Sequence, residues 1–251
     1  TRSLFYLMNL GISLAVVYFS AAWFVHTLQL ERARSDSLLS NMLPAVITRR
    51  LKSDSATIAD DHAEVSVLFA DIVGFTTYSA TVSAGELVAD LNRVFRRFDE
   101  LTAQFGVEKI KTIGDAYMVA SGVPEQRDDH AVALADFALA LQAAAATVTR
   151  SDGEGFILRV GIHSGPAVAG VIGSARYAYD LWGDTVNTAS RMESHGEPGR
   201  VQISERTAAL LGDEFELEPR GAIDVKGKGL MQLFFLGERR AIATKTTTDH
   251  G

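Results

Sequence analysis

The order of elements that the sequence predicts, β-α-β-β-α-β, places the larger part of this chain in the α+β class. Three observations support this order: a strand-like apolar run over 65–70, two amphipathic helix patterns that enclose a strand pair, and another apolar run over 156–163. The same order defines a ferredoxin-like palm. The 251-residue chain leaves about 190 residues for this domain, enough for one hydrophobic core.

The first 30 residues are expected to form a transmembrane helix. No Asp, Glu, Lys or Arg occurs in residues 3–28, and at about 1.5 Å per residue this run can cross a hydrocarbon core of about 30 Å. A signal peptide is one alternative, but the run is too long for one and no small-residue cleavage site follows it. A buried core helix is the other alternative. Because the chain starts at Thr1, we expect residues 1–30 to be the last helix of a longer membrane region.

Basic residues are unequally divided between the two ends of this apolar run. Only Arg2 precedes the run, whereas five basic residues follow it closely: Arg32, Arg34, Arg49, Arg50 and Lys52. The cytoplasmic flanks of membrane helices carry such an excess of Lys and Arg. The sequence thus predicts a protein of the cell membrane whose long C-terminal part is cytoplasmic.

Residues 31–61 are expected to connect the membrane helix to the domain, mostly as a helix. Leu39, Met42 and Val46 follow a 3-then-4 spacing that can form a seam between two copies of the chain. Pro44 lies inside this pattern and should kink or interrupt the helix.

The polar stretch 53–64 is expected to be a linker that ends at the first strand. Ser83 and Glu86 then form a capping-box pattern, which predicts the start of a helix. Apolar residues follow at alternating gaps of four and three, which is typical of an amphipathic helix. These residues are Leu87, Leu91, Val94, Phe98, Leu101 and Phe105.

Strands are predicted next over 107–113 and 116–121, with a turn at Gly114-Asp115 between them. Acidic residues at 128–129 favour the start of a second helix, because they complement its N-terminal dipole. The later elements are predicted from shorter patterns: strands over 156–163 and 167–172, a helix over 185–195, short strands and a helix to about 236, and a disordered tail over 238–251.

Composition excludes several classes of function. The net charge of −7 argues against a general nucleic-acid binder, which needs a basic surface. The chain has no cysteine, so it can form neither a disulfide nor a thiolate metal site. The six histidines show no metal-ligand spacing.

Two aspartates, Asp71 and Asp115, lie where short apolar strands run into glycine-containing sequence. Their contexts are VSVLFADIVGFT (65–76) and IKTIGDAYMV (110–119). The segment between them is long enough for one helix, so a strand–helix–strand unit can bring the two carboxylates together. Adjacent carboxylates repel unless a cation lies between them, and Mg²⁺ prefers such oxygen ligands. The alternative is a pair of ordinary strand-end or turn aspartates.

Six motifs in chain order resemble those of the class III nucleotide cyclases, adenylyl cyclases in particular. They are FADIVGFT (69–76), KTIGDAYM (111–118), VGIHSGP (160–166), YDLWGDTVNTASRME (179–193), GRVQIS (199–204) and VKGKG (225–229). The resemblance covers about residues 62–237 and implies that they form a class III cyclase catalytic domain. The membrane helix and connector then look like the end of a six-helix bacterial cyclase, similar to half of a mammalian membrane cyclase.

The resemblance implies a metal and phosphate site in the first two motifs. Asp71, Asp115 and the Ile72 carbonyl match the ligands of two Mg²⁺ or Mn²⁺ ions per active site. The turn after Asp71 would offer backbone N–H groups to the phosphates, from Gly74, Phe75 and Thr76.

The later motifs imply a purine reader and transition-state residues. Lys111 and Asp180 match the adenine readers, since adenine donates from its N6 amine and accepts at N1. Guanine presents the reverse pattern, and the guanylyl relatives carry Glu and Cys at these positions. Asn187 and Arg191, four residues apart on one helix face, match the residues that orient the ribose and stabilise charge on the α-phosphate.

The last two motifs imply ligands for the triphosphate, namely Arg200 and Lys226. Lys228 lies nearby, and its role is open. In the family, the metal aspartates and the Asn/Arg pair that serve one ATP come from different subunits. A homodimer with two equivalent sites is therefore expected.

The resemblance implies an adenylyl cyclase that converts ATP to 3′,5′-cyclic AMP and pyrophosphate. The alternatives are a guanylyl cyclase and a catalytically silent nucleotide-binding dimerisation module. A diguanylate cyclase would need a Gly-Gly-acidic-acidic-Phe turn, whereas the strand pair here turns at 114–115. A transmembrane receptor without enzymatic activity is the remaining alternative.

Overall fold

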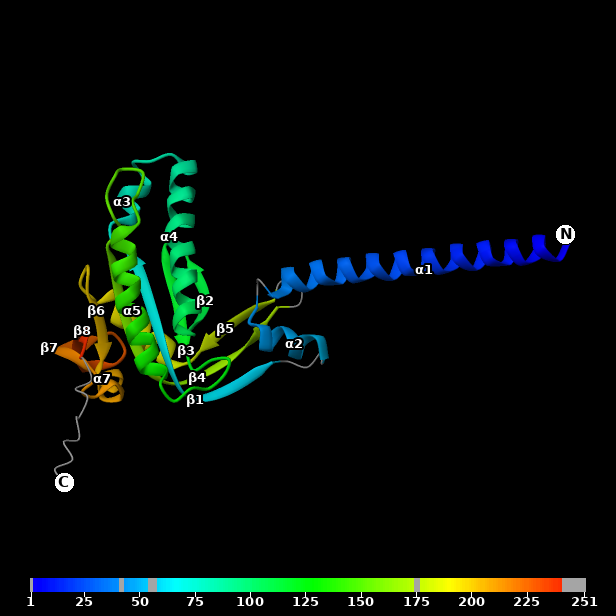
Figure 1. Ribbon diagram of the computed structural model, residues 1–251. Helices are drawn as coiled ribbons and strands as arrows, with labels where there is room; N and C mark the ends of the chain where they lie inside the picture. The colour runs from blue at the N-terminus through cyan, green and yellow to red at the C-terminus, as the bar shows by residue number, and fades with distance from the viewer. Residues whose placement is uncertain (1, 41–42, 54–57, 174–176, 241–251) are drawn as a thin grey trace, which may run out of the picture. The chain divides into compact units, whose positions relative to one another are not determined.

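The computed structural model describes residues 2–40, 43–53, 58–173 and 177–240 (Figure 1). The chain divides into two compact units, Thr1–Ala56 and Thr57–Gly251. The first unit holds two helices, α1 (Arg2–Ser40) and α2 (Ala45–Ser53).

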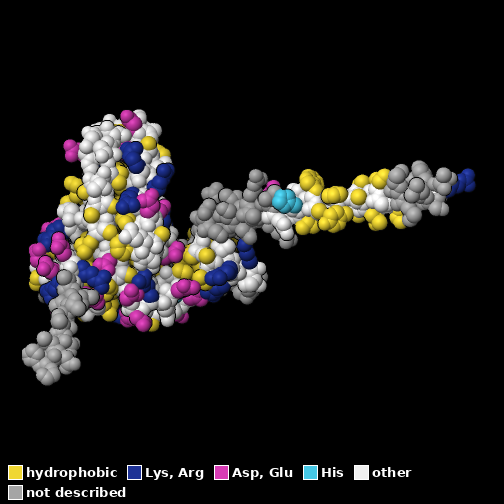
Figure 2. Space-filling view, viewed as in Figure 1, with side chains coloured by type: hydrophobic (Ala, Val, Ile, Leu, Met, Phe, Trp, Pro, Cys, Tyr) yellow, Lys and Arg dark blue, Asp and Glu magenta, His cyan; other side chains and the backbone are white. Residues whose placement is uncertain are grey.

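Helix α1 carries an apolar stretch that is long enough to cross a membrane. Residues Leu10–Gln29 have a mean hydropathy of 1.5, and none of them is buried in the structure. Figure 2 shows hydrophobic side chains along this helix. A second helix passes the same test of length and composition, His130–Thr147, but 56% of it is buried in the core of the second unit.

The interruption expected at Pro44 is confirmed, because α2 begins directly after this residue. The Pro44 carbonyl accepts a helical hydrogen bond from the Thr48 N–H at 2.9 Å. The seam of Leu39, Met42 and Val46 stays a prediction. Met42 and the side chain of Leu39 lie outside the described part of the chain, and Val46 is half-buried.

The second unit is an α+β domain. Its elements are β1 (Ala59–Ile72), α3 (Phe75–Ser79), α4 (Ala84–Phe105), β2 (Glu108–Ile113), β3 (Ala116–Ser121), α5 (His130–Thr147), β4 (Leu158–Ile172), β5 (Ala178–Trp182), α6 (Asp184–Ser194), β6 (Val201–Ser204), α7 (Glu205–Leu211), β7 (Phe215–Val225) and β8 (Gly229–Arg239). The predicted order β-α-β-β-α-β is confirmed by β1, α4, β2, β3, α5 and β4. The capping box at Ser83 and Glu86 is confirmed as well.

The strands form one sheet in the order β2-β3-β1-β4-β6-β8-β7, and β5 also pairs with β4. All pairs are antiparallel except β4 with β6. Helices α4 and α5 lie side by side (Figure 1) and pack on a core that includes Leu68, Ala70 and Ile72 of β1. Because strand side chains alternate between faces, Phe69 and Asp71 belong to the opposite face.

Helix α6 covers that opposite face. It approaches β4 so closely that a Cβ on Gly161 would lie 1.9 Å from the backbone nitrogen of Glu193. Gly161 is paired with Phe69 across β1 and β4. The glycine is therefore needed for the contact between helix and sheet, and α6 runs directly beside the row of residues that contains Asp71.

Strand β1 begins earlier than predicted, so the expected linker over 53–64 is wrong for residues 59–64. Residues 59–62 pair with β4, starting at Ala59 opposite Gly170, and 63–64 lie in the bulge that follows. A backbone ladder satisfies its polar groups without burying side chains, and most side chains of 59–64 remain at least partly exposed. Hydrophobic pattern therefore could not reveal this part of the strand.

Strand β4 is continuous, whereas two strands were predicted on either side of Pro166. A bulge in β1 between His62 and Val65 lies opposite this proline. Proline lacks an N–H and is tolerated in a strand at such an irregularity. The predicted tail over 238–251 also begins too early, because β8 continues to Arg239; residues 241–251 lie outside the described ones.

Candidate active site

The structure brings Asp71 and Asp115 together. Asp71 lies near the end of β1, and Asp115 lies in the turn between β2 and β3, where Gly114 adopts a φ of +64°. Burial raises the pKa of the Asp71 carboxyl to about 6, and the charge of Asp115 and a hydrogen bond between the two carboxyls contribute to the rise. The two carboxylates therefore repel each other when both are ionised.

An arginine and a glutamate complete this acidic cluster. Arg159 faces Asp71 across β1 and β4, and its Nη2 lies 3.2 Å from Asp71 Oδ2. Arg159 Nε also lies 2.7 Å from Glu193 Oε1 on α6. The pattern of the sequence did not indicate either residue. The one available sign was a charged residue at 159 within an apolar strand.

The donor atoms of the cluster are oxygens, which hard divalent cations prefer. The cluster offers two adjacent carboxylates, and the Ile72 carbonyl follows Asp71 directly. Among the described residues no group of three or more His, Cys, Asp or Glu side chains could hold a metal ion. Phosphate oxygens and water would have to supply the remaining ligands, as is common for Mg²⁺.

The turn after Asp71 leads into the short helix α3. Gly74 has a φ of +72°, which favours glycine, and its carbonyl accepts a hydrogen bond from the Tyr78 N–H at 3.0 Å. Gly74 and Thr76 are exposed, while Phe75 is half-buried against the core. The turn therefore lies beside the acidic cluster with its outer side open to a ligand.

Lys111 and Asp180 are in direct contact although 69 residues separate them. Lys111 Nζ lies 2.5 Å from Asp180 Oδ2, and Asp180 Oδ1 accepts a hydrogen bond from the Leu181 N–H at 2.8 Å. Asp180 belongs to β5, which pairs with the far half of β4. Sequence patterns did not predict this strand, because its five residues are too few for a periodicity.

Asn187 and Arg191 lie on the outer side of α6. The buried side of this helix consists of Thr185, Thr188, Ala189 and Met192. Arg191 and Glu193 are about 160° apart around the axis at about 100° per residue. Glu193 faces the Arg159 and Asp71 of its own chain, so Arg191 is directed away from them. Within the described residues, neither Asn187 nor Arg191 has a side-chain partner.

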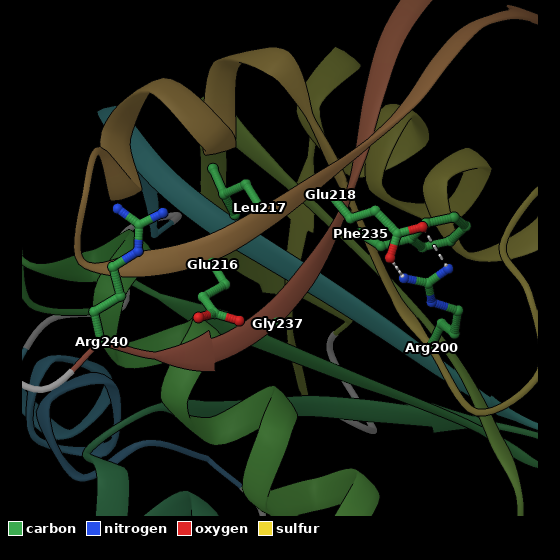
Figure 3. A pocket seen from close by; sticks show the side chains of 7 residues that line it. All are labelled: Arg200, Glu216, Leu217, Glu218, Phe235, Gly237 and Arg240. Carbon is green, nitrogen blue, oxygen red and sulfur yellow. Dashed lines mark hydrogen bonds and ion pairs between the residues drawn. The ribbon is translucent and has the colours of Figure 1, made fainter.

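Arg200 lies at the same end of the sheet as Asp71. Its carbonyl accepts a hydrogen bond from Val160, the residue that follows Arg159. Its guanidinium pairs with Glu218, with Nη1 3.1 Å from Oε1, and lies 3.7 Å from the centre of the Phe235 ring. These three residues line an open pocket of about 280 Å³ (Figure 3).

Lys226 and Lys228 lie in the turn between β7 and β8. The register of β6 with β8 places this turn toward Ser204, away from the Asp71 end of β4. Lys226 is exposed, and Lys228 forms an ion pair with Asp184 at the start of α6. The predicted site residues of one chain therefore lie in two separate places. One group lies around Asp71 and Arg200, and the other lies around Asp180 and α6.

Known proteins resemble this chain over most of its length. A family model described as the adenylate and guanylate cyclase catalytic domain matches residues 58–238. An adenylate cyclase of Mycobacterium tuberculosis is 48% identical over 237 residues, which cover 93% of this chain and 54% of the relative. The chain thus spans about half the length of that curated relative.

Guanylate cyclases are also similar. The guanylate cyclase soluble subunit beta-2 of Rattus norvegicus is 44% identical over 83% of this chain and 31% of its own length. A crystal structure of the guanylate cyclase domain of RhGC from Catenaria anguillulae in complex with GTP has a TM-score of 0.71 and 39% identity, and covers 72% of this chain and 100% of the domain. The chain belongs to the adenylate and guanylate cyclase family, whose catalytic domain is that of the class III nucleotide cyclases.

Proposed function

We propose that this protein is a membrane-anchored adenylyl cyclase that converts ATP to 3′,5′-cyclic AMP and pyrophosphate. The observation that carries the choice of ATP is the contact between Lys111 and Asp180. Overall similarity does not decide the substrate, because an adenylate cyclase at 48% and a guanylate cyclase at 44% identity both match.

The chemistry of the Lys111–Asp180 pair suits adenine. A carboxylate accepts from the N6 amine, and an ammonium group donates to N1. Guanine would leave both side chains without a partner, at about 1–3 kcal/mol each. The two costs together correspond to about 30-fold to 10⁴-fold discrimination if they add.

Asp71, Asp115 and the Ile72 carbonyl would hold two Mg²⁺ or Mn²⁺ ions, which supply charge neutralisation and a more acidic ribose 3′-hydroxyl. The turn through Gly74, Phe75 and Thr76 and the side chains of Arg200 and Lys226 would bind the phosphates. For Arg200 to do so, its guanidinium has to exchange Glu218 for a phosphate.

The reaction forms one bond and breaks one bond at the α-phosphorus. The 3′-oxygen attacks, its proton is lost, and pyrophosphate leaves with the bridging oxygen. Asn187 would orient the ribose, and Arg191 would stabilise the charge that develops on the α-phosphate. Both would act only where a nucleotide lies against the outer side of α6.

The orientation of α6 supports sites that two subunits share. Arg191 is directed away from the Asp71 of its own chain. A nucleotide that contacts Arg191 would therefore take its metal aspartates from a second copy of the chain. We therefore expect a homodimer in which each ATP contacts both chains. The apolar stretch 10–29 supports a membrane anchor, and the basic residues that follow it support a catalytic domain on the cytoplasmic side.

The decisive test is turnover by the purified protein, with ATP or GTP and with Mg²⁺ or Mn²⁺, and identification of the product by mass. We expect cyclic AMP from ATP and little cyclic GMP from GTP. Preference for GTP would favour a guanylyl cyclase. Absence of any cyclic product with all four combinations would favour a silent nucleotide-binding module.

A further inference from the structure

Asp90, on α4, is a buried carboxylate that the proposed chemistry does not use. It is 0% exposed, although a buried charge is costly unless it is fully hydrogen-bonded. The structure supplies four donors. Tyr78 Oη and the Ser151 N–H (2.8 Å) donate to Oδ2, and Arg93 and Ser151 Oγ (3.0 Å) donate to Oδ1. Burial alone would raise the pKa of Asp90, but these hydrogen bonds lower it, so the group is charged at neutral pH.

The four donors come from three separate parts of the fold. Arg93 lies on the same helix as Asp90, Ser151 lies in the loop between α5 and β4, and Tyr78 lies on α3. The Tyr78 ring is buried, and the guanidinium of Arg150 lies 4.6 Å from its centre. Asp90 thus joins α3 and the 149–155 loop to the long helix α4.

Helix α3 needs such an anchor. It has five residues, and a helix of this length is not stable on its own. Tyr78 is the residue whose N–H closes the first turn of α3 onto the Gly74 carbonyl. This bond gives a displacement of Tyr78 a direct route to Gly74 and to the exposed turn that follows Asp71.

We propose that Asp90 is a positioning residue for the triphosphate. Through the hydroxyl of Tyr78 it holds α3, and with α3 the turn 72–76, where the phosphates of the substrate are expected to bind. The inference rests on the proposed function of that turn. Asp90 is buried and has no exposed surface for a nucleotide, so it would act through Tyr78.

Two substitutions separate positioning from mere stabilisation. Tyr78→Phe keeps the buried ring and its contact with Arg150. It removes the hydroxyl that donates to Asp90 and also interacts with Ser151. Ser151→Ala removes a different donor from the same carboxylate and leaves α3 attached. Both variants leave Asp90 one hydrogen bond short, so both should lower the melting temperature.

The test measures KM and kcat for ATP with Mg²⁺ in the full chain, together with amide hydrogen exchange of residues 73–80. Tyr78→Phe should raise KM about 3- to 10-fold, the equivalent of about one hydrogen bond, with kcat within about twofold. It should also accelerate exchange at 73–80. Ser151→Ala should leave both quantities at the parental values.

Each other outcome overturns the inference. Faster exchange with an unchanged KM would make the contact purely structural, and a raised KM with unchanged exchange would mean that α3 does not transmit the effect. An equal rise of KM in Ser151→Ala would show that general destabilisation of the domain, and not the attachment of α3, raises KM. If the parental protein turned over neither ATP nor GTP, the cyclase proposal would fail, and parental exchange at 73–80 in Tyr78→Phe would separately refute the anchoring by Asp90.

Discussion

The two pairs of charged residues near the candidate site, Asp71 with Asp115 and Lys111 with Asp180, are opposite in electrostatic character. The first pair consists of like charges, and burial with mutual repulsion raises the pKa of Asp71 to about 6. The second pair consists of opposite charges in contact at 2.5 Å. Binding of a cation would relieve the repulsion in the first pair. In the second pair, the ion pair has to break before a purine can bind between the two side chains. A ligand therefore stabilises one region and has to compete with an existing contact in the other.

The largest effect is expected from removal of the like-charge pair. Asp71→Ala or Asp115→Ala should reduce turnover to below about one hundredth of the parental value, since even indirect changes around a metal cost about 10- to 100-fold. The free energy of unfolding without metal should not fall, because the substitution relieves repulsion. Turnover is measured as cyclic AMP formation, and unfolding is followed by thermal melting.

Asp213→Ala is the matched control, because Asp213 is a fully exposed carboxylate far along the chain. It should retain parental turnover. A folded Asp71→Ala protein with near-parental turnover would show that this carboxylate does not serve the reaction.

The second effect concerns the opposite-charge pair. The double variant Lys111→Glu with Asp180→Cys should lose its preference for ATP over GTP by about 30-fold to 10⁴-fold, because the donors and acceptors for adenine are reversed or removed. The ratio of kcat/KM for the two nucleotides measures this preference. Unchanged selectivity would show that the base is read elsewhere. The prediction does not require a gain of GTP turnover, because supporting residues also orient the readers.

These pairs also show what the sequence could and could not provide. The motifs identified Asp71, Asp115, Lys111 and Asp180 as candidates and placed the first two at strand ends. The predicted order of strands and helices is confirmed. Arg159 and Glu193 were missed because their roles follow from strand register and helix packing, which no local pattern records. Strand β5 was missed because it is short, and the start of β1 because its paired residues are polar.

The third effect is a dependence on pH that only the like-charge pair should show. The raised pKa means that the folded protein holds this proton more tightly than the unfolded chain does, so the stability from this group falls as pH rises from about 4 to about 6. A divalent cation has to displace the proton. Its apparent affinity should therefore fall about tenfold per pH unit below about 6.

The measurement is the rise in melting temperature on addition of Mn²⁺ at several pH values. The rise should be large at pH 7 and small at pH 5 in the parental protein. Asp71→Asn has no titrating group at this position and should lose most of the rise at pH 7. A parental rise of equal size at both pH values would contradict the assignment of the proton to the metal site.

The last prediction tests whether the two regions of one chain serve the same nucleotide, and its smallest difference is a factor of about two between a mixed dimer and the parental dimer. If each site takes Asp71 and Asp115 from one subunit and Arg191 from the other, Asp71→Ala and Arg191→Ala proteins should each be nearly inactive alone. In a mixed dimer one site collects both lesions and the other collects none. Activity should then recover to about half of the parental value per heterodimer, and the recovery should depend on protein concentration because association is required. Differential tags verify the heterodimer content. If verified heterodimers gained nothing over the separate variants, both regions would have to act within one chain, and the outward orientation of Arg191 on α6 would need another explanation.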